Sequence, residues 1–156
     1  MTRGWDLAQV NIARLREPLD SPTLADFVAA LDPVNAEAEA APGFLWRLQS
    51  DEGNATSIRA FEWDEADSAG VIVNLSTWES PEALRAYIFA GLHRQVLKRR
   101  REWFHHVAEA TTALWWVPEG HHPGTDEAES RVRTLREFGP SAEAFGLDSV
   151  VPPPGA

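Results

Sequence analysis

The chain has 156 residues, no cysteine, and 14 basic against 24 acidic side chains, which gives a formal net charge of −10 at pH 7. This length suits one domain with one hydrophobic core. The lack of cysteine excludes disulfides and thiolate chemistry and favours a cytoplasmic location, while the acidic balance argues against nucleic-acid binding. No apolar run reaches the roughly 20 residues of a membrane-spanning helix, so we expect no membrane contact.

The first half of the chain predicts two strands separated by helical segments. Residues 5–14 predict a strand, because their side chains divide between two faces with the two-residue period of a strand. Pro22 follows a serine, and this pair is typical of a helix start. Pro33 follows an aspartate, so we expect a second helical piece to begin there and to end at a Pro-Gly pair. Residues 44–49 then form the second predicted strand.

The second half carries the clearest strand of the chain, over residues 71–78. Residues 58–63 predict a short strand extension before it. Ser80 caps the next predicted helix, whose apolar stripe continues to about residue 104. Residues 114–117 predict a short buried strand. Its two adjacent tryptophans must point to opposite faces of the sheet, because side chains alternate along a strand.

The predicted elements follow the order β-α-β-β-α-β, and Thr125 caps one further helix near the C-terminal end. This order is that of the ferredoxin-like split βαβ fold, so we assign the chain to the α+β class with a four-stranded antiparallel sheet. We expect a single domain over residues 1–148. Residues 149–156 include three consecutive prolines and predict a flexible tail.

The chain has seven tryptophans but only one tyrosine and one methionine. An indole ring offers a flat apolar surface and a single hydrogen-bond donor. We therefore expect Trp78, Trp103 and Trp116 to wall a pocket for a small, partly apolar ligand between the sheet and its helices. The alternative is that these rings are ordinary core side chains.

His93 and Asn74 are the candidate catalytic residues. His93 lies on the inner side of the long predicted helix, where an imidazole can act as a general base or as a haem ligand. Asn74 follows three β-branched residues of a strand, and an amide buried there needs a protein group or a ligand as its partner. The alternatives are a core histidine bonded to a backbone carbonyl and an asparagine in a structural hydrogen bond.

Arg47 and Asn11 complete the predicted substrate-binding set. Arg47 alternates with apolar residues on the second strand, and its planar guanidinium can bind an anionic group unless a carboxylate of the chain pairs with it. Asn11 is the counterpart of Asn74 on the first strand. The adjacent His121 and His122 diverge in a turn, and no spacing typical of a metal site is present, so we expect no metal.

The segments LAQVNIAR, NLSTWES and LWWVPEGHHP are similar to a bacterial family catalogued only as a domain of unknown function, and the similarity extends from Trp5 to Phe145. That family is grouped with the dimeric α+β barrels, the antibiotic biosynthesis monooxygenase-like superfamily. The resemblance implies a dimeric ferredoxin-like fold. The superfamily includes cofactor-independent monooxygenases and haem-binding or haem-degrading proteins. Asn11, Trp78 and His93 resemble the Asn, Trp and His set of the haem-degrading members.

Three hypotheses about function follow. The first is a small-molecule-binding protein, with the chemistry of a cofactor-independent monooxygenase-like or isomerase-like enzyme if it is catalytic. His93 would then act as the base, and Asn74 would orient a substrate oxygen. The second is a haem-binding or haem-degrading protein with His93 as the iron ligand. The third is a non-catalytic dimer whose polar residues are all structural.

The predicted strands carry apolar residues on both faces, for example Leu45 and Trp46 on the second strand. Two crossover helices cover only one face of such a sheet, so we predict a homodimer in which a second copy covers the other face. Light scattering at micromolar concentration should then give twice the 17.3 kDa mass of one chain. The mass of a single chain would contradict this prediction.

Overall fold

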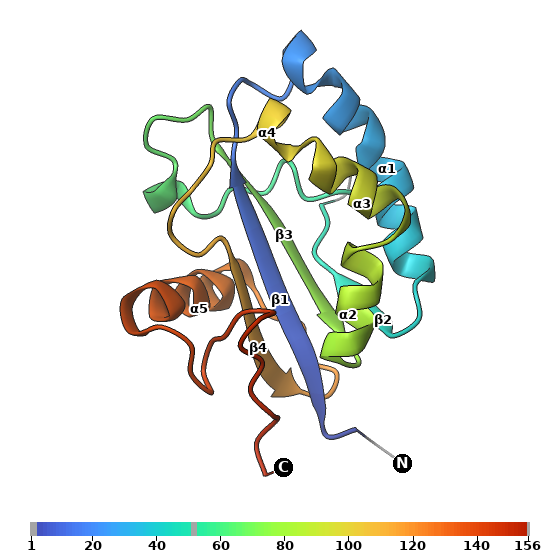
Figure 1. Cartoon of the computed structure of the whole chain (residues 1–156), viewed down its shortest axis with the longest axis vertical. Coiled ribbons are helices and arrows are strands. Elements are labelled where there is room, and N and C mark those ends of the chain that lie inside the picture. Colours follow the sequence, from blue (N-terminus) through green and yellow to red (C-terminus); the bar gives the residue numbers. More distant parts are fainter. Residues whose placement is uncertain (1–2, 51–52, 156) are drawn as a thin grey trace.

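The computed structural model describes residues 3–50 and 53–155 (Figure 1). Four strands form one antiparallel sheet in the order β2-β3-β1-β4, with the two longest strands at its centre. β1 spans Trp5–Arg14, β2 spans Phe44–Arg47, β3 spans Val71–Trp78 and β4 spans Thr112–Pro118. This is the strand order of the ferredoxin-like fold, so the predicted α+β class is confirmed.

The helices lie on both sides of this sheet (Figure 1). Four of them cover one side, which we call the helical face: α1 (Ala25–Ala40), α2 (Pro81–Ile88), α3 (Gly91–Lys98) and α4 (Arg100–Trp103). The last helix, α5 (Thr125–Phe138), covers the opposite side, which we call the α5 face. In the described part of the chain, no helix is both long and apolar enough to cross a membrane.

Alternation along the strands sorts the core into separate clusters. On the α5 face, Val10 and Leu75 pack against Val132 of α5 in one large cluster. The helical face carries two smaller clusters. The Trp78 cluster contains Leu7, Trp78, Leu84, Leu114 and Phe145, and the Trp103 cluster contains Leu15, Leu24, Phe27 and Trp103.

The two adjacent tryptophans of β4 belong to different faces, as predicted. Trp115 is fully buried in the cluster beneath α5, whereas Trp116 packs against the Trp78 cluster. The α5 face needs no second copy to cover it, because Val10 is 0% exposed and Leu75 is 1% exposed within one chain. The apolar alternation is thus explained by α5, and the homodimer stays a prediction.

Pro33 lies inside α1, so the predicted start of a second helical piece there is wrong. A proline within a helix removes one hydrogen bond and costs about 3 kcal/mol. Packing at both ends of the helix offsets this cost, because Phe27 before the proline and Ala38 after it are both buried. Tertiary contacts therefore override the local signal.

The predicted helix from Ser80 to residue 104 begins as expected but is broken twice. The Ser80 hydroxyl caps α2 by accepting a hydrogen bond from the Ala83 amide at 3.1 Å. Beyond α2, Gly91 has a φ of 54°, and the Leu92 amide donates to the Glu37 carboxylate of α1 at 3.0 Å. A Cβ on Gly91 would lie 2.5 Å from a Glu37 oxygen, so this break depends on glycine.

Residues 58–63 form no strand, contrary to the prediction. Phe61 has a left-handed φ of 57° and a fully buried side chain, and a short 3₁₀ helix, η2, spans Glu62–Asp64. This segment packs on the α5 face, where Phe61 joins the large cluster. One smaller prediction also differs, because Gly124 rather than Thr125 caps α5.

Hydrogen bonds of the Asp64 side chain link η2 to both β1 and α5. Its carboxylate is 6% exposed and accepts hydrogen bonds at 2.7 Å from Arg14 Nη2 and from Arg136 Nη1. Burial by itself raises the pKa of Asp64, but the two guanidiniums more than offset burial and hold this pKa below the ordinary aspartate value. The charged form of Asp64 therefore stabilises the fold.

We predict that Asp64→Asn lowers the free energy of unfolding at pH 7 by about 3 kcal/mol, because two partly buried guanidiniums then face a neutral amide. The depressed pKa means that the Asp64 carboxylate contributes its full stability above about pH 4 and loses it as the pH falls further. Urea unfolding should therefore show a smaller difference between variant and parent at acidic pH. Asp67→Asn, at an exposed position in the turn that follows η2, is the control, and an equal loss in both variants would contradict the prediction.

Candidate functional site

A band of polar side chains crosses the helical face of the sheet. Gln9 of β1 lies opposite Ser76 of β3, and Asn11 lies opposite Asn74. On the other side of β1, Asn11 also lies opposite Thr112 of β4. These five residues, which we call the polar band, separate the Trp78 cluster from the Trp103 cluster on the same face.

Hydrogen bonds connect the members of the polar band. The Gln9 amide donates to Asn74 Oδ1 and to Ser76 Oγ, each at 2.7 Å. Trp78 Nε1 donates to the same Ser76 hydroxyl at 2.8 Å, and Asn11 Nδ2 donates to Thr112 Oγ1 at 2.7 Å. The band is thus ordered by its own network before any ligand binds.

Asn11 and Asn74 are exposed although they lie on the two central strands. Asn74 Oδ1 already accepts a hydrogen bond from Gln9, and Asn11 Nδ2 already donates one to Thr112. Within the described residues, Asn74 Nδ2 and Asn11 Oδ1 have no hydrogen-bond partner. The middle of the helical face therefore presents one donor group and one acceptor atom on directly opposite residues.

Arg47 lies at the β2 end of the polar band, opposite Ser76. Its guanidinium donates to the Glu39 carboxylate of α1 at 3.0 Å and to the Gly53 carbonyl at 2.7 Å. The ion pair with a carboxylate, which was the alternative to ligand binding, is the arrangement that the structure shows. The Arg47 guanidinium is therefore already paired within the chain.

His93 is held by helix α2 and by an aromatic ring. Its Nδ1 lies 2.9 Å from the Ile88 carbonyl, and its ring centroid lies 5.0 Å from that of Tyr87. Tyr87 in turn stacks on Trp78 at 5.2 Å, so Tyr87 connects His93 to the Trp78 cluster. In the described part of the chain, no hydrogen bond or ring contact joins His93 directly to Asn74.

The surroundings of His93 fix its protonation. Burial lowers the pKa of His93, and the Ile88 carbonyl and the Glu37 carboxylate offset only part of this effect. The ring is therefore neutral at pH 7, and Nδ1 carries the proton because it can only donate to a carbonyl. Nε2 remains as a lone-pair acceptor. Burial likewise raises the pKa of the neighbouring Tyr87 far above its ordinary value.

The residues present do not fit haem. Asn11 and Trp78 share a face but lie four register positions apart, and Tyr87 rather than an open space adjoins the His93 ring. A histidine ligand needs room for the macrocycle beside its ring.

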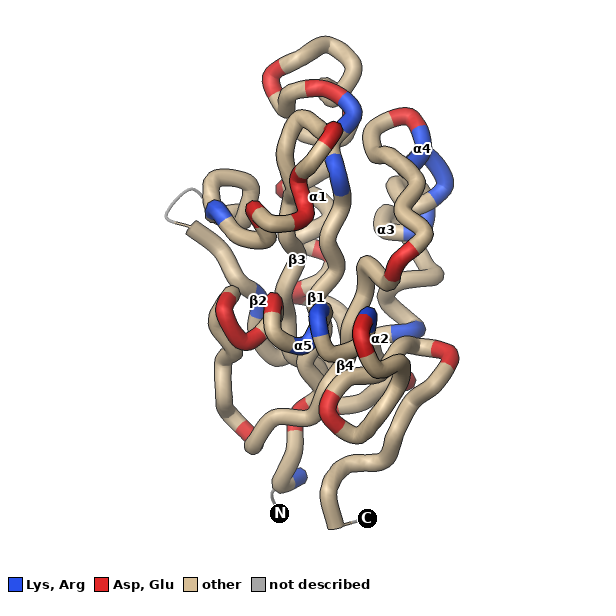
Figure 2. The backbone as a smooth tube through the Cα atoms, turned by 90° about the vertical axis from the view of Figure 1, so that its left-hand side faces the viewer, with Lys and Arg blue, Asp and Glu red and all other residues tan. Residues whose placement is uncertain are grey.

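The three predicted pocket tryptophans are members of the apolar clusters. Trp103 of α4 is 2% exposed, and its ring centroid lies 5.4 Å from that of Phe27. Basic residues gather along α3 and α4 (Figure 2). Trp116 is half-buried, and its Nε1 donates to the Val151 carbonyl at 2.7 Å, within the segment predicted to be a tail. Trp78 alone contacts the polar band, through Ser76.

Two members of this region were missed by reasoning from the sequence. Tyr87 lies three residues after Leu84 in α2, and this spacing predicts that both side chains lie on the inner side of the helix. Thr112 lies before the predicted limit of the fourth strand, and no local signal places it beside Asn11. Only the pairing of β1 with β4 brings these two residues together.

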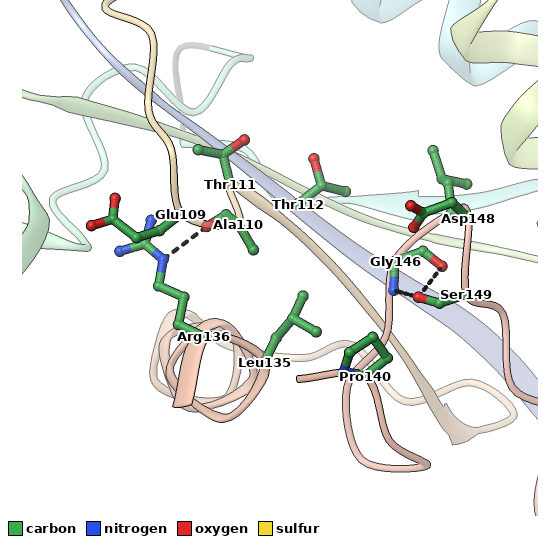
Figure 3. A pocket seen from close by; sticks show the side chains of 11 residues that line it. Glu109, Ala110, Thr111, Thr112, Leu135, Arg136, Pro140, Gly146, Asp148 and Ser149 are labelled. Carbon is green, nitrogen blue, oxygen red and sulfur yellow. Dashed lines mark hydrogen bonds between the residues drawn. The ribbon is translucent and has the colours of Figure 1, made fainter. Parts of the chain in front are cut away.

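A hollow of about 550 Å³ adjoins the polar band at Thr112 (Figure 3). It lies between the first residues of β4, the last turn of α5 and the turn that follows Phe145. Its lining residues are Glu109, Ala110, Thr111, Thr112, Leu135, Arg136, Pro140, Gly146, Leu147, Asp148 and Ser149. None of the residues predicted from the sequence lines it.

The two adjacent histidines of the β4–α5 turn diverge, as expected. His121 Nε2 lies 2.8 Å from a Glu127 oxygen, whereas the His122 ring stacks on Trp46 at 4.7 Å. Over residues 3–50 and 53–155, no three His, Cys, Asp or Glu side chains gather as a metal site would require. Both histidines thus have identified neighbours.

The fold and the polar band define a ferredoxin-like α+β protein with an ordered polar surface beneath its helices. The chain belongs to the family described as Domain of unknown function (DUF3291), whose model matches residues 6–156. This confirms the resemblance drawn from the sequence. No curated protein matches the chain.

Several solved structures share parts of this fold at low sequence identity. PA3566 from Pseudomonas aeruginosa is 7% identical, with 78% of this chain and 100% of that chain covered and a TM-score of 0.48. Rv0793 from Mycobacterium tuberculosis is 13% identical, with 76% and 99% covered and a TM-score of 0.46. SnoaB from Streptomyces nogalater, a cofactor-independent oxygenase, is 15% identical, with 74% and 94% covered and a TM-score of 0.44.

We predict that His93 titrates below the ordinary histidine pKa and that His93→Ala destabilises the protein by roughly 1–3 kcal/mol, because the Ile88 carbonyl loses its donor. A depressed pKa means that neutral His93 stabilises the fold above about pH 6.5, and that this stability declines as the pH falls below that value. NMR titration and thermal melts measure the two effects. The exposed His106→Ala is the control, and equal melts for both variants would refute a structural role.

Proposed function

We propose that this protein binds a small, partly apolar molecule over the polar band. The observation that carries the proposal is the exposed pair Asn11 and Asn74 on the central strands. A side chain at the middle of a helix-covered sheet face is ordinarily apolar and buried. Two amides that keep an unpaired donor and acceptor there are suited to a ligand.

The chemistry of the pair selects a class of ligand. Asn74 Nδ2 would donate to an acceptor on the ligand, and Asn11 Oδ1 would accept from a donor beside it. A primary carboxamide or a hydroxyl next to a carbonyl carries both groups. The apolar part of such a molecule would lie against the Trp78 cluster or the Trp103 cluster, which flank the band.

If the protein is catalytic, the same region provides side chains for a cofactor-independent reaction of the monooxygenase-like or isomerase-like kind. Asn74 would orient a substrate oxygen, as the sequence suggested. His93 would serve as the base through Nε2, because its proton is held on Nδ1 by the Ile88 carbonyl. Since Tyr87 separates His93 from Trp78, this role requires a substrate long enough to reach past the Tyr87 ring.

Benzamide is a suitable probe, because it joins a donor and an acceptor to an apolar ring. We expect millimolar benzamide to shift the side-chain NH₂ signals of Asn11 and Asn74 in ¹⁵N NMR spectra. Asn74→Ala should weaken binding about fivefold, which corresponds to one hydrogen bond. N,N-dimethylbenzamide, which has no N–H, should bind more weakly than benzamide.

Gln95→Ala is the matched control, because it removes an exposed amide from α3, outside the polar band. It should bind benzamide as the parent protein does. The proposal fails if benzamide shifts no signal of the band, or if the Gln95 and Asn74 variants bind it equally well.

A further inference from the structure

We propose a second site, independent of the polar band: the hollow at the outer edge of β4 binds a short extended peptide that carries basic side chains. β4 is an edge strand of the sheet, so one side of its backbone faces away from β1. An edge of this kind can accept an added strand through main-chain hydrogen bonds.

The ladder pattern identifies which backbone groups are free. The Ile12 amide donates to the Thr111 carbonyl at 2.9 Å, which makes Asn11 and Thr112 a pair without mutual backbone hydrogen bonds. The N–H and C=O of Thr112 therefore point away from β1, toward the hollow. No described residue pairs with either group.

The chain itself shows that this edge accepts backbone pairing, through an isolated β-bridge between Leu114 and Phe145. Two residues further along β4, the Leu114 amide donates to the Phe145 carbonyl at 2.7 Å, and the Phe145 amide donates back at 2.9 Å. The added segment then turns away, because the Gly146 amide donates to the Ser149 hydroxyl at 2.9 Å. An incoming peptide would continue this interrupted pairing at Thr112.

The hollow has the size and lining that a peptide of a few residues needs. Its volume of about 550 Å³ lies in the range of known ligand sites. Leu135 and Pro140 form an apolar wall opposite β4, and Thr111 and Ser149 add hydroxyl groups (Figure 3). Alternate side chains of an extended peptide would meet the apolar wall and the solvent.

Charge around the hollow favours basic side chains. Arg136 donates hydrogen bonds to Asp64 at 2.7 Å and, through Nε, to the Ala110 carbonyl at 2.8 Å. Arg14 also donates to Asp64, so both guanidiniums are already paired. Glu109 lies 4.0 Å from Arg14 and keeps 58% of its side chain exposed, and Asp148 is exposed. Among the lining residues there are thus two carboxylates, Glu109 and Asp148, and one guanidinium that is already paired, in a chain whose net charge is −10.

The same charges argue against a second copy of this chain as the occupant. A second copy carries the same net charge of −10, so like charge opposes its approach to this edge. A foreign basic strand meets no such repulsion.

The probe is the peptide acetyl-Lys-Val-Lys-Val-amide, titrated into the full chain in ¹⁵N NMR. We expect shifts at the backbone amides of Thr112 and Ser149. Backbone N-methylation of the first valine should weaken binding roughly tenfold, since it removes a strand-pairing donor without altering the protein. Glu109→Gln should weaken binding several-fold at low salt, whereas the exposed Glu82→Gln on α2 should not.

Asn74→Ala should bind this peptide as the parent does, which separates the hollow from the polar band. The proposal is overturned if the N-methylated peptide binds equally well, or if shifts appear at Asn11 and Asn74 instead. It is also overturned if Thr112 signals change with protein concentration and light scattering shows a doubled mass, because a second copy then occupies the edge.

Discussion

The antiparallel pairing of β1 with β3 is the constraint on which the rest of the structure depends. Its register places Asn11 opposite Asn74 and Gln9 opposite Ser76. Because strand side chains alternate between faces, this register also sends Val10 and Leu75 to the opposite face, under α5. A slip of one residue would bury the asparagines under α5 and expose the apolar side chains. The polar band and the core are therefore fixed by the same hydrogen bonds.

The helical face differs from the α5 face because polar residues interrupt it. Two apolar clusters anchor α2 at one end and α4 with α1 at the other, and the polar band lies between them. Each buried side-chain nitrogen or oxygen of the described residues has a hydrogen-bond partner. The exposed amides of Asn11 and Asn74 keep a free donor and a free acceptor, and this contrast with the buried polar atoms is the basis for proposing a ligand site there.

Much of the candidate site could be predicted from alternation alone. Asn11 and Asn74 were identified on the first and third strands, and the structure brings them together. Arg47 was placed on the correct strand, but its pairing with Glu39 depends on where α1 packs. His93 was placed on the inner side of its helix, but the break at Gly91 turns its ring to Tyr87 and Ile88. Local periodicity carries no information about such breaks.

The sequence by itself determined the order of strands and helices along the chain, the faces of the strands and the α+β class, because these follow from two-residue alternation and from short turn signals. The tertiary structure alone decided that α5 covers the second face, that Pro33 stays within α1, and that Thr112 joins the polar band. Each of these depends on contacts between residues far apart in the chain. Their free energy comes from packing and pairing, which no local pattern records.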